Sequence, residues 1–141
     1  MLPGRKSDQA SPGTVLLRYV GNHFDFIGMR PYYPRLFQRL VLAGDRQVER
    51  IIKEHFLPLS KLVLALIERG MSSGEFRTMD ARHTAMSLVA LTVFDSNAAP
   101  VIRLIGGTDV FDRKYRARRK EEVLKFIRYA LFKDPEAARP S

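Results

Sequence analysis

The stretch "LIERGMSSGEFRTMDARH", residues 66–83, joins two segments whose apolar residues recur with helical spacing. Gly70 can end the first helix, and Gly74 permits the tight turn that must follow it. Asp80 can cap the second helix, since its side chain accepts a hydrogen bond from a free amide of the first turn. Phe76 is the one aromatic residue among polar neighbours, so we predict that it packs back against the helices instead of facing solvent.

Helical periodicity extends through most of the chain on both sides of this connection. The clearest pattern begins at Asp45 and runs to Gly70, and Pro58 predicts a kink or break in it near residues 54–58. No segment has the pattern of a strand. The other predicted helices cover residues 12–27, the region from Pro31 to Ala43, residues 80–94, residues 100–106 and a final stretch from Thr108 or Asp112 to Phe132. We therefore predict an all-α bundle of about five to six helices.

Residues 14–133 form the predicted domain, with residues 1–13 as a flexible leader and residues 134–141 as a flexible tail. The chain of 141 residues is long enough for one hydrophobic core without disulfides or bound metal. It has no cysteine, which excludes a disulfide framework, a thiolate metal site and a cysteine nucleophile. The longest apolar run, residues 62–67, is too short to cross a bilayer, and the start does not resemble a signal peptide. We expect a soluble cytoplasmic protein with no membrane partner.

The net charge of +9 favours a polyanionic partner, and six basic residues gather in the first half of the last predicted helix. Such a cluster can bind phosphates, because each neutralised phosphate releases counterions. Two glutamates follow it and few side chains that read base edges accompany it, so we favour a solvated helix face. The alternative is a basic all-α interaction module that docks on nucleic acid or an acidic protein. The six residues are Arg113, Lys114, Arg116, Arg118, Arg119 and Lys120.

Metal binding and catalysis find little support in the sequence. His23, His55 and His83 lie on three different predicted helices, without the spacing of a metal site. No glycine-rich phosphate loop, GxSxG motif or Ser/His/Asp arrangement is present. We therefore expect no metal, no cofactor and no enzymatic activity. His55, beside Phe56 at the expected kink, is the best candidate for a polar anchor in a ligand pocket.

Aromatic and methionine residues are spread over the first four predicted helices and can converge on one pocket. Rings and thioethers line apolar cavities, while tyrosine hydroxyls orient a ligand. Any one of these residues, taken alone, is better explained as part of an ordinary core, and only as a group beside the expected kink do they favour a pocket. The group comprises Phe24, Phe26, Met29, Tyr32, Tyr33, Phe37, Phe56, Met86 and Phe94.

The helix predicted over residues 80–94 is apolar around most of its circumference. A helix with so little polar surface should be covered on both sides. In a domain this small, a second copy of the molecule can supply one of those covers.

The order of these features resembles the C-terminal regulatory domain of the TetR family of transcriptional repressors. In that family a long helix ends in a glycine, a connection of the form G-x-x-x-G-x-F/L follows, and a helix beginning at Asp leads into the dimer interface. Gly70, Gly74, Phe76 and Asp80 match these positions, and the resemblance covers about residues 13–132. Family members also carry an N-terminal helix-turn-helix domain, which the leader is too short to contain. We expect either a piece of a longer regulator or a protein without a DNA-reading domain.

The resemblance implies a homodimer that encloses a small, often hydrophobic effector and transmits its binding through residues 14–28. DNA is then contacted only through the missing N-terminal domain. The expected ligand-binding residues are Phe24, Tyr33, Phe37, His55, Phe56 and Met86. The expected dimer interface pairs Met86, Ala90, Leu91 and Phe94 with Phe126, Ile127, Tyr129 and Ala130 of the last helix.

Overall fold

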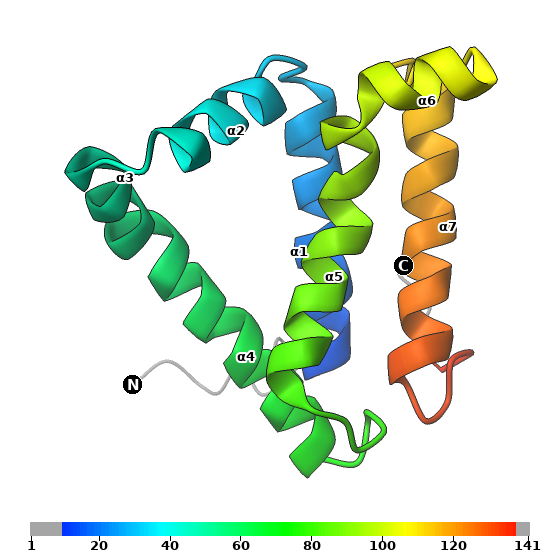
Figure 1. The fold of residues 1–141 in the computed structure, drawn as a ribbon. Helices are drawn as coiled ribbons and strands as arrows, with labels where there is room; N and C mark the ends of the chain where they lie inside the picture. The colour runs from blue at the N-terminus through cyan, green and yellow to red at the C-terminus, as the bar shows by residue number, and fades with distance from the viewer. Residues whose placement is uncertain (1–9, 138–141) are drawn as a thin grey trace, which may run out of the picture.

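The computed structural model describes residues 10–137, which form helices joined by short connections (Figure 1). The helices are α1 (Pro12–Gly28), α2 (Tyr33–Ala43), α3 (Arg46–Ile51), the π-helical turn η1 (Ile52–Phe56), α4 (Leu57–Ser72), α5 (Ala81–Asn97), α6 (Ala99–Gly106) and α7 (Arg113–Leu131). Because α3, η1 and α4 follow one another without a gap, they correspond to the long helical pattern predicted from Asp45 to Gly70. The all-α class is confirmed. Within the described residues, the only strand-like pairing is an isolated bridge between Phe76 and Phe132.

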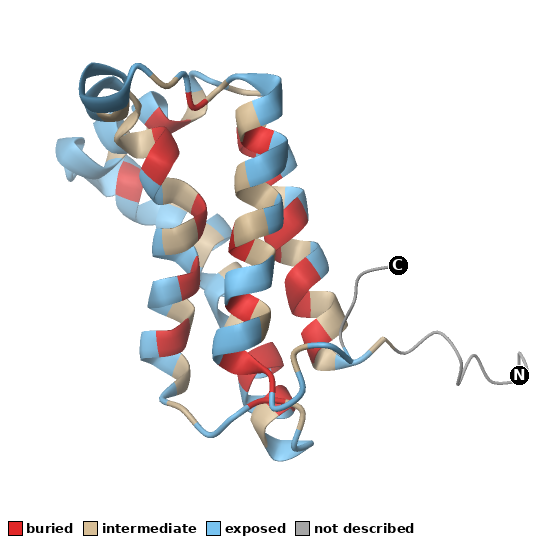
Figure 2. Cartoon of the chain, turned by 90° about the vertical axis from the view of Figure 1, so that its right-hand side faces the viewer, coloured by how far each residue is buried: buried red, intermediate tan, exposed pale blue. Residues whose placement is uncertain are grey.

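Three helices, α1, α5 and α7, stand side by side, and α4 leans away from them towards its N-terminal end (Figure 1). α2 and α3 span the space between the end of α1 and the start of α4. Buried residues lie mainly on the faces that the packed helices turn towards one another (Figure 2). The core contains Leu16, Leu17, Val20 and Phe24 of α1, Ile67 of α4, Leu88 of α5, Val123, Ile127 and Leu131 of α7, and Phe76 and Phe132 from the connections.

The connection between α4 and α5 has the predicted turn and cap, but Gly70 has a different role. α4 continues two residues past Gly70, so the prediction that this glycine ends the helix is wrong. A side chain at Gly70 would overlap the Phe76 ring, and this close approach is what requires glycine. Gly74 adopts a φ of +80°, and the Asp80 carboxylate accepts a 2.9 Å hydrogen bond from an amide in the first turn of α5. Phe76 is buried at 1% exposure, as predicted.

The same connection also holds the end of α7 and the start of α1. The Phe76 and Phe132 rings meet edge to face with centroids 5.0 Å apart, and two backbone hydrogen bonds join the connection to the residues that end α7. The Glu75 carboxylate accepts hydrogen bonds from the Ser11 hydroxyl at 2.8 Å and from the Gly13 amide at 3.2 Å. The first turn of α1 is therefore attached to the unit formed by these two chain segments.

Pro58 changes the winding of the continuous helical segment α3–η1–α4 without breaking it. The Leu57 amide donates its hydrogen bond to the Ile52 carbonyl, five residues earlier instead of four. A wider turn relieves the clash between a proline ring and the carbonyl four residues before it. The interruption predicted near residues 54–58 is thus a π-helical turn over Ile52–Phe56.

Described structure extends beyond both limits of the predicted domain, residues 14–133. α1 begins at Pro12 with Ser11 as its cap, inside the leader expected over residues 1–13. Residues 134–137 of the expected tail form turns, and the Tyr129 hydroxyl lies 2.6 Å from the Glu136 carboxylate. The rest of the expected leader, residues 1–9, and of the tail, residues 138–141, lies outside the described residues.

Replacing Gly70 with alanine is expected to lower the free energy of unfolding by about 1–3 kcal/mol, since overpacking displaces the Phe76 ring. Gly106→Ala is the matched control, because the nearest atom to an added Cβ there is Thr108 Oγ1 at 3.7 Å. Urea unfolding followed by circular dichroism measures both variants. Equal unfolding midpoints for Gly70→Ala and the unsubstituted chain would contradict the packing role of this glycine.

Candidate ligand cavity

A cavity of about 290 Å³ lies between α2 and the continuous segment α3–η1–α4. It is found where these helices diverge from the core, at the end of the molecule where α4 leans away from α1 (Figure 1). Its lining consists of Tyr33, Leu36, Phe37 and Leu40 of α2, Ile51 of α3, His55 and Phe56 of η1, and Leu59 of α4. Two helical walls that diverge from the core thus leave room for a small molecule.

The local sequence explains both walls of the cavity. Tyr33, Phe37 and Leu40 recur at intervals of four and three residues, so their side chains share one face of α2. On the opposite wall, the π-helical turn carries His55 and Phe56 into the lining. The Phe37 and Phe56 rings meet with centroids 5.4 Å apart and planes tilted by 47°. An aromatic pair from two separate helices therefore closes one side of the cavity.

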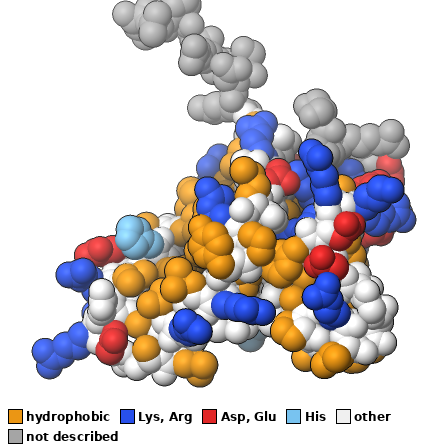
Figure 3. Space-filling view, turned by 90° about the horizontal axis from the view of Figure 1, so that it is seen from above, with side chains coloured by type: hydrophobic (Ala, Val, Ile, Leu, Met, Phe, Trp, Pro, Cys, Tyr) orange, Lys and Arg blue, Asp and Glu red, His pale blue; other side chains and the backbone are white. Residues whose placement is uncertain are grey.

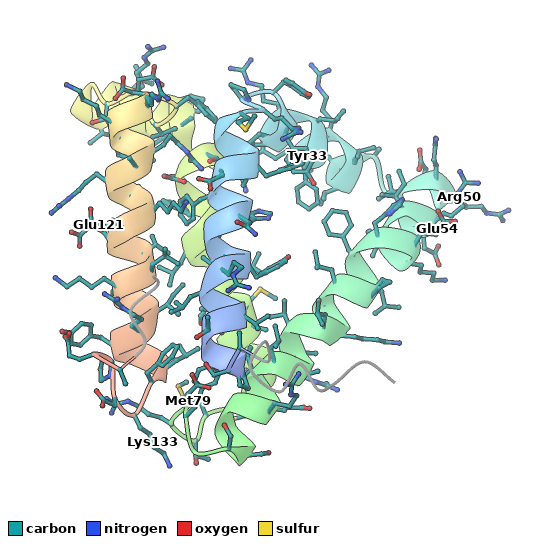
Figure 4. The ribbon with its side chains drawn as sticks, turned by 180° about the vertical axis from the view of Figure 1, so that it is seen from behind. Tyr33, Arg50, Glu54, Met79, Glu121 and Lys133 are labelled. Atoms are coloured by element: carbon teal, nitrogen blue, oxygen red, sulfur yellow. The ribbon has the colours of Figure 1, made fainter. Side chains whose placement is uncertain are left out.

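Only two side chains of the lining carry polar groups, Tyr33 and His55, and none is a carboxylate, a lysine or an arginine. On the α3–η1 segment, Arg50 pairs with Glu54 at 3.9 Å and Lys53 with Glu49 at 2.7 Å, and none of these four residues lines the cavity. In Figure 4 Arg50 and Glu54 lie at the outer corner, whereas Tyr33 points into the space between α2 and α4. Because the lining offers apolar surface and no charged partner, this half-open cavity favours an uncharged, mostly apolar molecule.

Four of the six residues expected to bind a ligand line this cavity, namely Tyr33, Phe37, His55 and Phe56. Phe24 does not, because its ring is buried in the core between α1 and its neighbours. Met86 does not either, because it lies on α5 and is 69% exposed. The aliphatic part of the lining was not singled out from the sequence, although its helical spacing from Phe37 was a usable signal for α2. Those residues are Leu36, Leu40, Ile51 and Leu59.

Both α5 and α7 carry exposed apolar residues on the side that faces away from the core. Six of the eight expected interface residues are exposed, namely Met86, Ala90, Phe94, Phe126, Tyr129 and Ala130. Leu91 is partly buried against the core. Ile127 has 0% exposure, so the expectation that it contacts a second copy is wrong. The helical turn that exposes Phe126 directs Ile127 into the core of its own protomer.

Exposed apolar residues also occur at the end of the molecule formed by α2 and α6. Leu42, Leu104 and Ile105 are each more than 80% exposed, and none of them lines the cavity. Figure 3 looks onto this end and shows hydrophobic side chains interspersed with Lys and Arg.

Arg116, in the basic run at the start of α7, is buried instead of solvated. It donates hydrogen bonds to the Phe24 carbonyl at 2.8 Å and to the Ser96 hydroxyl at 3.1 Å. Its guanidinium lies 3.9 Å from the buried Asp95 carboxylate. Burial lowers the pKa of Arg116, an effect that the nearby Asp95 partly opposes. This one side chain therefore connects α7 with α1 and α5.

Two further residues of the basic run face the fold, which corrects the expectation of a wholly solvated helix face. Arg119 lies 3.9 Å from the second oxygen of Asp95, and Lys120 binds Asp25 of α1 at 2.9 Å. Arg118 is exposed but pairs with Glu122 at 2.9 Å along the helix. The basic run is thus divided between structural contacts and the surface.

His23, His55 and His83 lie on α1, η1 and α5. In the part of the chain that the structure describes, no group of three or more His, Asp or Glu side chains is arranged to hold a metal ion. Across residues 10–137, no single helix is long and apolar enough to cross a membrane, and α5 with α6 meets those criteria only as a pair bent by 64°.

Residues 12–127 match the family model described as the tetracyclin repressor-like C-terminal domain, and the chain therefore belongs to this family. The resemblance identified from the sequence is confirmed. A search of curated proteins found no match. Family membership makes the chain a regulatory domain in general terms.

Replacing Arg116 with methionine is expected to lower the free energy of unfolding by about 1–3 kcal/mol, because it removes the buried hydrogen bonds to the Phe24 carbonyl and the Ser96 hydroxyl and leaves Asp95 with Arg119 as its remaining basic neighbour on α7. Arg118→Met is the matched control, since that side chain is 71% exposed and its surface ion pair contributes at most about 1 kcal/mol. Thermal and urea unfolding compare the two variants. A loss for Arg116→Met no larger than that for Arg118→Met would contradict the structural role of the buried guanidinium.

Proposed function

We propose that this domain senses a small, mostly apolar effector, which binds in the cavity between α2 and η1. The observation that carries the proposal is the lining itself, where aromatic and aliphatic side chains from four helical segments surround two polar groups. Ligand sites commonly have this composition, an apolar wall with few polar groups that fix orientation. Membership of the tetracyclin repressor-like family supports the same function.

The chemistry of the lining restricts the class of effector. The Tyr33 hydroxyl both donates and accepts a hydrogen bond, and the His55 imidazole offers a second polar contact from the opposite wall. An uncharged molecule with an aromatic or aliphatic body and one or two hydroxyl, carbonyl or amine groups satisfies both. The cavity, with a volume of about 290 Å³, has room for the body of a small molecule.

The proposal includes a homodimer formed through α5 and α7. Met86 and Phe94 of α5 and Phe126 of α7 are each more than 60% exposed. Large apolar side chains exposed in this number on two neighbouring helices are unfavourable in water and mark an interaction surface. A two-fold axis brings the same surface of a second copy against them, which is the commonest arrangement of homo-oligomers.

The regulated activity is DNA binding by a helix-turn-helix domain that the described residues do not include. In a dimer, two such domains must match half-sites separated by about one helical turn of DNA. A small change in the direction of α1, the first helix of the regulatory domain, changes that separation. The effector acts only if its affinity differs between the two arrangements.

The alternative, a basic module that docks on nucleic acid or an acidic protein, has less support. Arg116, Arg119 and Lys120 are engaged with α1 and α5, and Arg118 pairs with Glu122. The basic run therefore offers few charges for a phosphate backbone, whose binding strengthens with each charge neutralised.

The uncharged dye phenylnaphthylamine is expected to bind the cavity and to gain fluorescence there. Phe37→Ala should weaken its binding about tenfold, because removing one aromatic wall loses about 1–2 kcal/mol of apolar contact. Leu104→Ala is the control, since this residue of α6 is 87% exposed and lies outside the lining. Equal affinities of the two variants, or no binding to the unsubstituted chain, would contradict a ligand site at this cavity.

Sedimentation at micromolar concentration is expected to give a dimer for the unsubstituted chain. Phe94→Glu combined with Phe126→Glu should give a monomer, because burying two carboxylates between copies is unfavourable. Leu42→Glu is the control, as this residue of α2 is 86% exposed and lies away from α5 and α7. A monomeric unsubstituted chain, or a dimer that the double substitution leaves intact, would exclude the proposed interface.

A further inference from the structure

We propose that Tyr33 couples the cavity to α1 through the ring of Phe26, so that an occupied cavity changes the stability of the last two turns of α1. This inference rests on the proposed function, because it requires the cavity to bind a ligand. It adds a named contact through which binding in the cavity acts on α1.

Tyr33 belongs to the cavity and to the contact with α1 at the same time. Its side chain lines the cavity, and its ring meets the Phe26 ring edge to face, with centroids 5.2 Å apart and planes at 89°. Edge-to-face pairs have a preferred geometry, so a displaced ring alters the energy of its partner. Among the ring contacts of the described residues, this is the one that joins the cavity lining to α1.

Phe26 is itself held by other side chains of the same helical surface. The Arg30 guanidinium lies 4.1 Å from the centre of the Phe26 ring, and its Nη1 donates a 3.4 Å hydrogen bond to the Phe26 carbonyl. The His23 ring also stacks with the Phe26 ring, with centroids 6.4 Å apart. A cation above an aromatic ring is attracted to it, so Arg30 holds the Phe26 ring in place, and His23 packs against the same ring. A displacement of the Phe26 ring therefore changes its contacts with side chains one turn before it and one turn after it in the sequence.

The two ends of α1 have different attachments. At its start, Glu75 binds Ser11 and Gly13, and this anchor lies at the opposite end of the helix from the cavity. Near its end, Arg116 of α7 binds the Phe24 carbonyl, two residues from Phe26. A change that begins at Tyr33 consequently reaches the end of α1 first, where α1 also contacts the helix that carries Phe126.

The coupling can be measured by amide hydrogen exchange along α1 with and without phenylnaphthylamine. We expect the last two turns of α1 to exchange through an open state that does not bind the dye. Dye at ten times its Kd then stabilises the closed state and slows the exchange of these amides about tenfold. Exchange in the first two turns of α1 serves as the internal reference. Each variant is studied at ten times its own Kd, so that differences in affinity do not contribute.

Phe26→Leu is expected to bind the dye with a Kd within about twofold of the unsubstituted chain, since Phe26 does not line the cavity. It should nevertheless abolish the slower exchange of residues 21–28, because leucine lacks the ring that meets Tyr33. Phe26→Tyr retains a ring and should restore the effect. Tyr32→Leu is the matched control on the neighbouring aromatic residue, which is 64% exposed, and it should leave the effect unchanged.

The possible results separate this inference from the proposed function. Absence of dye binding to the unsubstituted chain would refute the cavity site and with it the coupling. Dye binding without any slower exchange at the end of α1 would refute the coupling alone. The coupling would also be refuted if Phe26→Leu kept the full response, or if Tyr32→Leu lost it as completely as Phe26→Leu.

Discussion

The buried guanidinium of Arg116 joins the three helices on which the rest of the structure depends. It binds the Phe24 carbonyl of α1 and the Ser96 hydroxyl of α5, and it faces Asp95. A charge in such surroundings is tolerated only when hydrogen bonds and an opposite charge replace its hydration. These requirements fix α1, α5 and α7 relative to one another. α4 packs against α1 and α5, and its buried residues, Leu66, Ile67 and Gly70, all lie in its second half.

The cavity follows from this arrangement of the helices. Since α4 is held at Leu66 to Gly70 and its first half leans away, α2 and η1 approach each other outside the core. Their apolar faces line a space instead of filling it, and the π-helical turn before Pro58 carries His55 and Phe56 into the wall. The well-packed helices α1, α5 and α7 thus support a less densely packed region formed by α2, α3 and η1. This is the usual division between a rigid scaffold and a ligand-sensing region.

Features that depend on neighbouring residues in the sequence were predictable, whereas most features that depend on tertiary contacts were not, the burial of Phe76 being the exception. Asp80 caps α5 as predicted, and Asp45, where the long helical pattern begins, caps α3 in the same way, because a capping bond forms within one turn. The role of Gly70 depends on a ring six residues away that folds back onto it. The sequence also offered no way to separate Phe24, which is in the core, from Phe37, which lines the cavity, since both lie on apolar helix faces. That distinction arises from the direction of α4.

A crystal structure of the chain grown with phenylnaphthylamine tests the central claim most directly. The account predicts electron density for the dye in the space between α2 and η1, packed against the Phe37–Phe56 pair, with its amine within hydrogen-bonding distance of Tyr33 or His55. Density confined to the surface of α5 and α7, with the space between α2 and η1 closed by its own side chains, would contradict a ligand-sensing cavity.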